Sequence, residues 1–394
     1  MTAGRASAFV TGAFWSMLLC ANLATPLYAG YSTQFGFSTA VLALIFAIYA
    51  LVLMPSLVLF GQLSDRLGRR PVIAAALAVQ IGALAVFAAA GSVLWLFVAR
   101  ALQGLAQGMM SGAATAALAE LVSGEDTRRP ALLATLAQSG GGATGPLLSG
   151  MLAQWVTDPY VVPFVVGIAI CAALMATLAL VPETRGGDDN DGGWRIQRPG
   201  VPAEIRGDFA RVAITGAAVW AVAGGLFLSV IQSYASDEFG TKNLALLGLL
   251  TAVLLATSCA TQLLVRRGAP PVPAQAGGLV LLALGLLGLV LAHWVAPVLL
   301  IVGAALAGAG HGLAFLAAQD NLTQIAPASQ RAEISAAFYV CIYLGVAVPV
   351  IGIGILAATI SLFVGIAVFA AVTGAASLAT AAWHLHHSRE QGAP

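Results

Sequence analysis

The feature that most constrains this chain is a succession of apolar stretches, each about twenty residues long, separated by short segments that hold most of the charges. A helix of ~20 apolar residues is long enough to span a bilayer. Only 8% of the residues are charged and 60% are hydrophobic, whereas soluble domains are about 25% charged. So few charges cannot cover a water-exposed surface, so lipid must be the solvent for most of the protein. The net charge of +1 suggests no nucleic acid partner.

The apolar stretches predict twelve membrane-spanning helices, in an all-α membrane protein. We place them at residues 8–29, 39–60, 71–90, 93–119, 131–154, 160–181, 210–234, 244–264, 275–292, 296–317, 333–356 and 358–383. The connections are short except for residues 183–209, which are polar and rich in Gly, Asp, Arg and Pro. We expect this stretch to be a cytoplasmic linker between an N-terminal six-helix bundle (residues 1–182) and a C-terminal one (residues 210–394).

The basic residues indicate the orientation of these helices. With both termini in the cytoplasm, 15 of the 17 basic residues fall on the cytoplasmic side, as the positive-inside rule requires. Lys242 falls outside, and Arg100 falls within a predicted span. The first apolar stretch is too long for a signal peptide, so we read it as the first span. The preference for arginine over lysine hints at a bacterial source, and we expect a multi-pass protein of the bacterial cytoplasmic (inner) membrane.

The two halves of the sequence resemble each other. At an offset of 200, six of eleven positions are identical: Gln62, Leu63, Arg66, Gly68, Pro71 and Val72 match Gln262, Leu263, Arg266, Gly268, Pro271 and Val272. At an offset of 204, Gly104 and Gly108 match Gly308 and Gly312. Two matches at nearly the same offset predict an internal duplication. Parallel six-helix repeats, with a substrate site between them near the midplane, are a transporter architecture.

The segment Gly61–Arg70, between the second and third predicted helices, is the strongest local signal. Gly61 permits close helix packing, and Asp65 is an acceptor for an arginine or a helix N-terminus. Gly68 is expected to turn the chain. The donors are Arg66, Arg69 and Arg70. Such a cluster can hold the cytoplasmic helix ends in one state and release them in another; the alternative is a simple topology anchor.

Polar residues on the fourth predicted helix form a second candidate site. A buried arginine at membrane depth is costly, and it must face a cavity or a partner. Arg100, Gln103 and Gln107 share one helical face, so we expect this face to line a central cavity or a proton path. The alternative is that Arg100 extends to the outer headgroups.

A third candidate is the fifth predicted helix, which contains Gly141, Gly145, Pro146 and Gly150. Proline removes a backbone hydrogen bond and bends a helix, and the glycines allow tight packing. We expect a pivot here, with a generic small-residue packing face as the alternative.

Four further residues are candidates for the cavity. Asn22 lies just before a Thr25-Pro26 kink, while Tyr339 and Tyr343, one turn apart, could stack on a substrate or bond to it. His311 is, besides Arg100, the titratable group placed well inside a span. Histidine titrates in the useful pH range, so His311 is a candidate proton carrier; the alternative is a packed neutral imidazole.

Several kinds of site are missing from the sequence. Lys242 is the one lysine, and it does not lie in a nucleotide-binding loop, so ATP hydrolysis is not expected. No H-E-x-x-H or G-x-S-x-G motif occurs. The four cysteines are far apart in sequence and lie in apolar stretches, so we expect small buried side chains rather than a disulfide or zinc site. We therefore expect no metal, no cofactor and no enzymatic activity.

Three of these segments resemble signatures of the major facilitator superfamily. Gly61–Arg70 is similar to G-x-L-[SA]-D-R-x-G-R-[RK], and Arg100–Gly104 to R-x-x-Q-G. Gly141–Gly150 is similar to G-x-x-x-G-P-x-x-G-G, an antiporter motif, with Ser149 in place of one glycine. Pro182-Glu183-Thr184 also ends the sixth predicted helix as P-E-[ST] often does in this family. The resemblance is closest to the twelve-helix drug:proton antiporters.

This resemblance implies proton-coupled efflux of small amphipathic or drug-like molecules by two rocking bundles, in a chain that works as a monomer. One alternative is metabolite uptake by proton symport or facilitated diffusion. Another is a membrane sensor or scaffold without transport, against which the intact Gly61–Arg70 segment argues.

Overall fold

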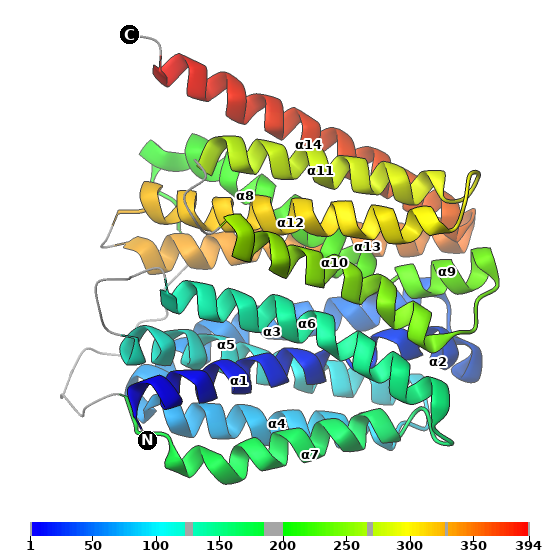
Figure 1. Cartoon of the computed structure of the whole chain (residues 1–394), viewed down its shortest axis with the longest axis horizontal. Helices are drawn as coiled ribbons and strands as arrows, with labels where there is room; N and C mark the ends of the chain where they lie inside the picture. Colours follow the sequence, from blue (N-terminus) through cyan, green and yellow to red (C-terminus); the bar gives the residue numbers. More distant parts are fainter. Residues whose placement is uncertain (1, 123–128, 185–199, 266–270, 328–329, 393–394) are drawn as a thin grey trace. The chain divides into compact units, whose positions relative to one another are not determined.

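A computed structural model describes residues 2–122, 129–184, 200–265, 271–327 and 330–392. These residues are almost entirely helical (Figure 1). The first six spans are formed by α1 (Ala3–Ala21) with α2 (Tyr28–Phe35), α3 (Thr39–Leu67), α4 (Arg69–Ala88), α5 (Val93–Leu121), α6 (Arg129–Trp155) and α7 (Val162–Thr177). The last six are formed by α8 (Arg206–Trp220) with α9 (Ile231–Phe239), α10 (Leu244–Val265), α11 (Pro271–Leu291), α12 (Val298–Ile325), α13 (Arg331–Thr359) and α14 (Leu362–Gly392).

The twelve predicted spans each correspond to one of these helices or helix pairs, so the predicted fold class is confirmed. Among the described residues, eleven helical segments are long and apolar enough to cross a membrane. The twelfth, α6, has the 27 residues needed. Its middle is rich in small and polar residues, from Ser139 to Thr144, which lowers its mean hydropathy.

The segment Gly61–Arg70 differs from the predicted loop. Helix α3 continues to Leu67, and α4 begins at Arg69, so Gly68 is the residue between the two helices. Its φ of +96° lies in the left-handed region that favours glycine. The turn therefore occurs at Gly68, and the preceding residues of the motif form the last turns of α3.

The chain divides into two compact units. Unit 1 comprises Met1–Leu27 and Ile48–Gln197, and unit 2 comprises Tyr28–Ala47 and Arg198–Pro394. In unit 1, α1 packs against α5, α6 and α7, and α4 packs against α5 and α7. In unit 2, α12 packs against α10, α11 and α8, while α14 packs against α11 and α13. Most of the predicted linker, residues 185–199, lies outside the described residues.

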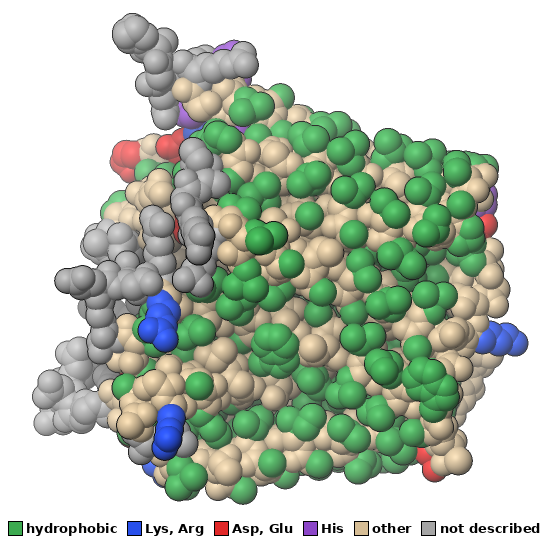
Figure 2. All heavy atoms as spheres, viewed as in Figure 1, with side chains coloured by type: hydrophobic (Ala, Val, Ile, Leu, Met, Phe, Trp, Pro, Cys, Tyr) green, Lys and Arg blue, Asp and Glu red, His purple; other side chains and the backbone are tan. Residues whose placement is uncertain are grey.

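The helix surfaces are apolar along most of their length. Figure 2 shows hydrophobic side chains spread over the helices on the face drawn, with charged side chains near helix ends. Large apolar side chains such as Trp155, Leu264 and Val298 are 60% or more exposed. Water would not tolerate so many exposed apolar groups, but hydrocarbon does.

Two spans are interrupted at equivalent positions. In the first span, α1 ends at Ala21, and the chain continues through a short 3-10 turn at Thr25–Leu27 before α2. In the seventh, α8 ends at Trp220 and a π-helical segment, Ala221–Phe227, precedes α9. The two interruptions lie about 200 residues apart, which is the offset of the sequence repeat. Each interruption adjoins a polar site described below.

Candidate functional site

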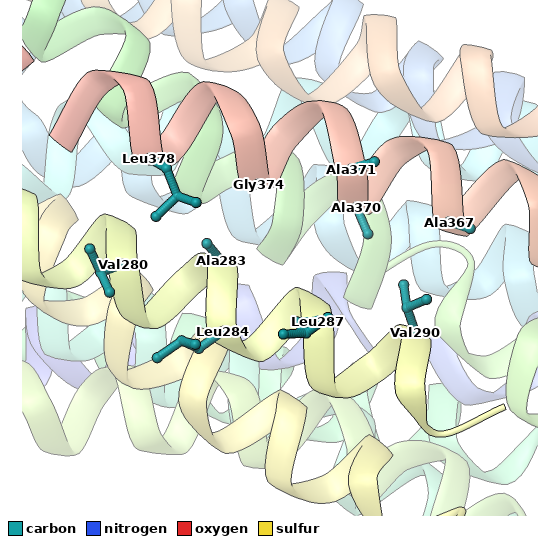
Figure 3. Close-up of a pocket in the computed structure, with 10 residues that line it drawn as sticks. All are labelled: Val280, Ala283, Leu284, Leu287, Val290, Ala367, Ala370, Ala371, Gly374 and Leu378. Carbon is teal, nitrogen blue, oxygen red and sulfur yellow. The ribbon is translucent and has the colours of Figure 1, made fainter. Parts of the chain in front are cut away.

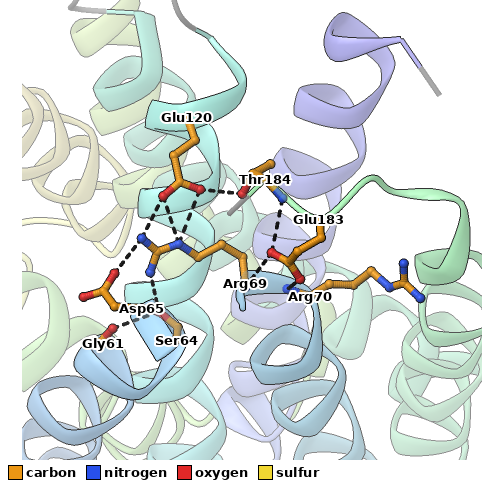
Figure 4. Close-up of polar contacts among 8 residues, drawn as sticks. All are labelled: Gly61, Ser64, Asp65, Arg69, Arg70, Glu120, Glu183 and Thr184. Atoms are coloured by element: carbon orange, nitrogen blue, oxygen red, sulfur yellow. Dashed lines mark hydrogen bonds and ion pairs between the residues drawn. The ribbon is translucent and has the colours of Figure 1, made fainter. Parts of the chain in front are cut away.

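A polar latch joins three helix ends in unit 1, and Arg69 is its centre (Figure 4). We define the latch as Ser64, Asp65, Arg69, Glu120, Glu183 and Thr184. The Arg69 guanidinium is 2.6 Å from an Asp65 oxygen and 2.7 Å from a Glu120 oxygen. It also donates to the Ser64 hydroxyl at 2.6 Å. One buried cation thus ties the end of α3 to the end of α5, in charge-assisted bonds that are stronger than neutral ones.

Glu183 forms the second half of the latch, at the start of α4. Its carboxylate accepts the backbone N–H groups of Arg69 at 2.8 Å and of Arg70 at 3.1 Å. A carboxylate at a helix N-terminus is stabilised by the helix dipole and by these free donors. A Cβ on Gly68 would come within 2.7 Å of a Glu183 oxygen. Gly68 is thus required both by its φ angle and by the approach of Glu183.

The two halves of the latch are connected through Thr184, whose hydroxyl donates to Glu120. Of the predicted residues, Asp65, Gly68, Arg69 and Arg70 lie here, while Gly61 contributes to packing where Gly112 of α5 approaches it. Sequence reasoning missed Glu120 and Glu183 as partners of this segment. The sequence signal for Glu183 was the similarity of Pro182–Thr184, at the end of the sixth span, to the P-E-[ST] pattern.

Arg100 and Gln103 cap the broken end of α1. The Arg100 guanidinium donates to the Ala21 carbonyl at 3.0 Å and to Gln103 Oε1 at 3.1 Å. Gln103 Nε2 donates to the Cys20 carbonyl at 3.3 Å. The last carbonyls of a helix lack partners within the helix and carry partial negative charge, so a cation suits this position. These contacts point Arg100 into unit 1 and exclude the alternative in which it extends to the headgroups.

The other face of Arg100 lies over an aromatic ring. Its Cζ is 5.5 Å from the centre of the Tyr49 ring, a cation–π distance. Only 2% of Arg100 is exposed. Gln107, the third residue of the predicted face, instead bonds along its own helix to the Ser111 hydroxyl at 3.0 Å. The predicted polar face is therefore divided between capping α1 and a bond within α5.

The glycine-rich part of α6 packs against α1. A Cβ on Gly141 would overlap the Trp15 carbonyl, and one on Gly145 would overlap the Leu19 carbonyl. Trp15 Nε1 also donates to the Thr144 hydroxyl at 3.0 Å. Gly150 is buried and Pro146 lies inside the helix. The small residues thus bring α6 to backbone contact with the last turns of α1, beside the break.

In unit 2, His311 of α12 lies at the centre of a buried polar cluster. Its Nδ1 is 2.8 Å from the Ser258 hydroxyl of α10, and Gln262 Nε2 donates to the same hydroxyl at 3.1 Å. The imidazole is 1% exposed. It meets Trp220 edge-on, with ring centres 5.3 Å apart, and stacks on Phe315 at 5.7 Å. The histidine therefore has polar neighbours on one side and aromatic ones on the other.

The glycines that surround His311 repeat a contact of unit 1. A Cβ on Gly308 would overlap the Leu254 carbonyl, and one on Gly312 would overlap the Ser258 carbonyl. In unit 1, a Cβ on Gly104 would likewise overlap the Tyr49 carbonyl, and one on Gly108 would come within 2.5 Å of Ser56. The repeated glycines thus form equivalent helix contacts, α3 with α5 and α10 with α12.

The break in the seventh span is capped by neutral groups. The carbonyl of Phe227 accepts the Thr251 hydroxyl at 2.7 Å and Gln232 Nε2 at 2.8 Å. Gln232 Nε2 also lies 2.6 Å from the Thr251 hydroxyl. This break and its partners were not predicted from the sequence. The signals for it were Gly224-Gly225 and the offset of 200 from Thr25-Pro26.

The remaining predicted cavity residues are placed as follows. Asn22 ends α1 and donates from Nδ2 to the Leu18 carbonyl at 2.8 Å. Tyr339 and Tyr343 are half-buried on α13, and Tyr339 lies edge-on to Phe338.

Two cysteines that are distant in sequence meet in unit 1. The sulfurs of Cys20 and Cys171 are 3.7 Å apart, and both remain free thiols. Across the described residues, no group of three His, Cys, Asp or Glu side chains is arranged to hold a metal ion.

An apolar groove of about 360 Å³ lies between α11 and α14 (Figure 3). Its walls include Val280, Leu284 and Leu287 on one helix and Ala370, Gly374 and Leu378 on the other. None of its lining side chains is polar. The groove suits hydrocarbon chains and offers no group that could recognise a polar substrate.

Comparisons with known proteins agree with this geometry. The family model described as Major Facilitator Superfamily matches residues 6–350. A bacterial homologue of the human lysosomal transporter Spinster, in an inward-facing unoccupied conformation, is similar in structure with a TM-score of 0.73 at 15% identity. That match covers 98% of this chain and 97% of the other. No curated protein sequence matches the chain.

Two further solved structures are similar. A mutant of the nucleoside transporter NupG has a TM-score of 0.71 at 13% identity, with 97% of this chain and 99% of the other covered. A POT family transporter in complex with 5-aminolevulinic acid has a TM-score of 0.77 at 13% identity, with 97% and 96% covered. At these identities the likeness shows the fold alone.

Proposed function

The chain belongs to the major facilitator superfamily, and from that premise we propose that it exports small amphipathic or drug-like molecules in exchange for protons. Family membership makes it a multi-pass membrane transporter of small molecules rather than an enzyme. The direction, the proton and the substrate class are our proposal. In this proposal residues 1–182 and 210–394 are the two moving bundles, joined by the linker 183–209.

The observation that carries the export proposal is the contact between α6 and α1. Gly141 and Gly145 bring α6 against the last turns of α1, and Pro146 lies one residue further along. This is the segment that resembles the antiporter motif. It supports a role as pivot, because a helix with a proline, and with glycines at its closest contacts, can bend while it keeps its packing.

The latch supports a gating role in the same proposal. Arg69 forms charge-assisted hydrogen bonds with Asp65 and with Glu120. A network of this kind can hold the helix ends together in one state and release them in another. We place this end of the helices, and both termini, in the cytoplasm, in the inner membrane of a bacterium. We also propose that the chain works as a monomer.

Proton coupling is assigned to His311. It is buried in unit 2 with a hydroxyl on Nδ1, and a histidine can change its charge within the physiological pH range. Arg100, the other candidate for coupling, contributes a guanidinium charge at the break in the first span. The cavity roles of Asn22, Gln103, Gln107, Tyr339 and Tyr343 belong to the same proposal.

Reconstituted vesicles with an imposed pH gradient test this function directly. The purified protein is screened against dyes and metabolites in both gradient directions. Export by antiport predicts that substrate accumulates in the compartment that is acidic. Accumulation in the opposite compartment would show uptake with protons, and transport that ignores the gradient would show facilitated diffusion.

Asp65→Asn is the gating variant for this assay, with Asp158→Asn, outside the latch, as its matched control. We expect Asp65→Asn to lose most of the flux while its thermal unfolding midpoint in detergent stays close to that of the parent protein. Undiminished flux in Asp65→Asn would contradict the gating role. Lost flux in both variants would indicate a general effect of removing charge.

A further inference from the structure

Among the described residues, the buried side chains of the Arg, Lys, His, Asp and Glu types are all basic. They are Arg69, Arg100, Arg211, His311 and His384. No aspartate or glutamate occurs among the buried polar side chains of the described residues, and none of the sixteen acidic residues falls in the middle of a predicted span. A buried cation attracts anions strongly where the dielectric constant is low. Arg69 and Arg211 are already paired with carboxylates at helix ends, but the described residues offer no buried carboxylate to pair with a lipophilic cation. The interior therefore suits an anionic ligand better than a lipophilic cation.

The hydrogen bonds around His311 fit a tautomer with a free N–H group. Gln262 Nε2 donates to the Ser258 hydroxyl, and the amide has no other role toward that oxygen. The hydroxyl lies 2.8 Å from His311 Nδ1 and can donate its own proton to it. A neutral imidazole that accepts at Nδ1 carries its proton on Nε2. With Nδ1 bonded to Ser258, the Nε2–H is the ring donor left for a further partner.

Two buried N–H groups in the cluster of His311 with Trp220 and Phe315 have no hydrogen-bond partner among the described residues. They are His311 Nε2 and Trp220 Nε1. The two rings meet edge-on with centres 5.3 Å apart. Phe315 lies against both, 5.6 Å from Trp220 and 5.7 Å from His311. Buried polar groups are nearly always paired, so two neighbouring donors without partners indicate an acceptor that binds there.

We propose that Trp220, His311 and Phe315 form a substrate subsite for the carboxylate of an aromatic acid. The two N–H groups donate to the carboxylate oxygens, and Phe315 supplies an apolar wall for the ring. The subsite lies wholly within unit 2, beside the break in the seventh span. This inference rests on the proposed transport function and narrows its substrates from drug-like molecules in general to aromatic anions.

Binding of two matched probes tests the subsite. 1-Naphthoate and 1-naphthylmethylammonium share a bicyclic ring and differ in the sign of their charge. Their binding to the detergent-solubilised full-length protein is measured by calorimetry, without any gradient. We expect 1-naphthoate to bind at least about tenfold more tightly than the ammonium, the effect of one hydrogen bond to a charged group.

Trp220→Phe removes one donor and keeps an aromatic ring, with Trp294→Phe as the matched control. We expect Trp220→Phe to weaken 1-naphthoate binding about tenfold, Trp294→Phe to leave it unchanged, and both to keep the parent's unfolding midpoint. His311→Met, which removes the second donor, is expected to weaken binding similarly. If Trp220→Phe unfolds, His311→Met alone decides the result.

Three results would overturn the subsite: no binding of 1-naphthoate, equal or tighter binding of the ammonium, or unchanged binding in the folded donor variants. These results are separable from a failure of the proposed function. Gradient-driven export of a cationic dye without 1-naphthoate binding would remove the subsite and leave export standing. Binding of 1-naphthoate without any gradient-driven flux would leave the subsite standing and remove the export proposal.

Discussion

The breaks in the first and seventh spans occupy equivalent positions in the repeat, but their carbonyls are capped by different chemistry. At the end of α1, Arg100 and Gln103 donate to the carbonyls of Ala21 and Cys20. Before α9, Thr251 and Gln232 donate to the carbonyl of Phe227. One break thus holds a permanent charge, and the other is capped by neutral groups.

The same contrast appears beside the repeated glycines. At the offset of 204 that aligns Gly108 with Gly312, Gln107 aligns with His311. Gln107 cannot titrate, whereas a histidine can. The two halves share these backbone contacts and differ in the side chains beside them. In our account, unit 1 supplies a fixed charge and unit 2 supplies the group that gains and loses a proton.

The largest expected effect comes from removing the fixed charge. Arg100→Ala leaves the Ala21 carbonyl without its guanidinium donor at a buried position, and hydrogen bonds to charged groups contribute about 1.5–3 kcal/mol each. We expect the variant to lose about 3 kcal/mol of stability, because Gln103 Oε1 also loses its donor. Thermal unfolding in detergent micelles measures the change.

Arg206→Ala, at an exposed position on α8, is the control for Arg100→Ala and should change stability by less than about 0.5 kcal/mol. Equal stability of the two variants would mean that the charge at the first break contributes nothing.

The second prediction tests whether the glycine contacts of the two units are equivalent. Gly104→Ala and Gly308→Ala each place a methyl group against a backbone carbonyl that cannot move aside. We expect each to destabilise its unit by about 1–3 kcal/mol, as overpacking does. Unfolding midpoints of the two variants are compared.

Gly82→Ala is the matched control, because a Cβ there has nothing within 4 Å. It should leave stability unchanged or raise it by up to about 1 kcal/mol, since alanine is the better helix former. A loss of stability in Gly104→Ala without one in Gly308→Ala would show that the two helix contacts are not equivalent.

The third prediction concerns the neutral cap of the seventh span. Thr251→Val keeps the shape of the side chain and removes the hydroxyl that donates to Phe227. We expect a loss of about 1 kcal/mol, the contribution of a neutral hydrogen bond. Thr177→Val is the control, since its exposed hydroxyl bonds only within its own helix. A loss as large as that of Arg100→Ala would erase the contrast between the two caps.

The smallest effect is expected at the end of α9, beyond the predicted span 210–234. Helix α9 carries Asp237 and Glu238 there, whereas its counterpart α2 carries no acidic residue. Burial, and then the charge of Glu238, raise the pKa of Asp237. An acid whose pKa is raised in the folded state stabilises folding at low pH and loses that contribution as pH rises through the raised pKa.

Asp237→Asn should therefore be slightly more stable than the parent protein at pH 7, by less than about 0.5 kcal/mol, and equal to it near pH 3. Unfolding midpoints at the two pH values measure the difference. A stability gain that is larger at pH 3 than at pH 7 would reverse the sign and contradict the raised pKa.

The spans and the first break could be predicted from sequence because their causes are local. About twenty apolar residues suffice for a span, and Thr25-Pro26 suffices for a kink. The extension of α3 to Leu67 was missed because polar residues beyond the membrane do not show where a helix ends. The partners of Arg69 were missed because Glu120 and Glu183 lie 51 and 114 residues away.

The sequence also could not predict that the polar residues on the face of Arg100 bind different partners. A shared helical face shows that Arg100, Gln103 and Gln107 are neighbours, but it does not show which element lies opposite. The structure places the broken end of α1 there, so two of these residues also cap a helix. The meeting of Cys20 with Cys171 depends in the same way on the packing of α1 against α7.

The most direct test of this account makes unit 2 resemble unit 1 through His311→Gln. Proteoliposomes containing this variant are supplied with the compound identified in the vesicle screen, and two rates are compared: exchange without a gradient, and accumulation driven by a pH gradient. The account predicts that exchange persists, lowered by no more than about tenfold through the change in the subsite, and that accumulation against the gradient is lost. Accumulation equal to that of the parent protein would contradict His311 as the site of proton coupling.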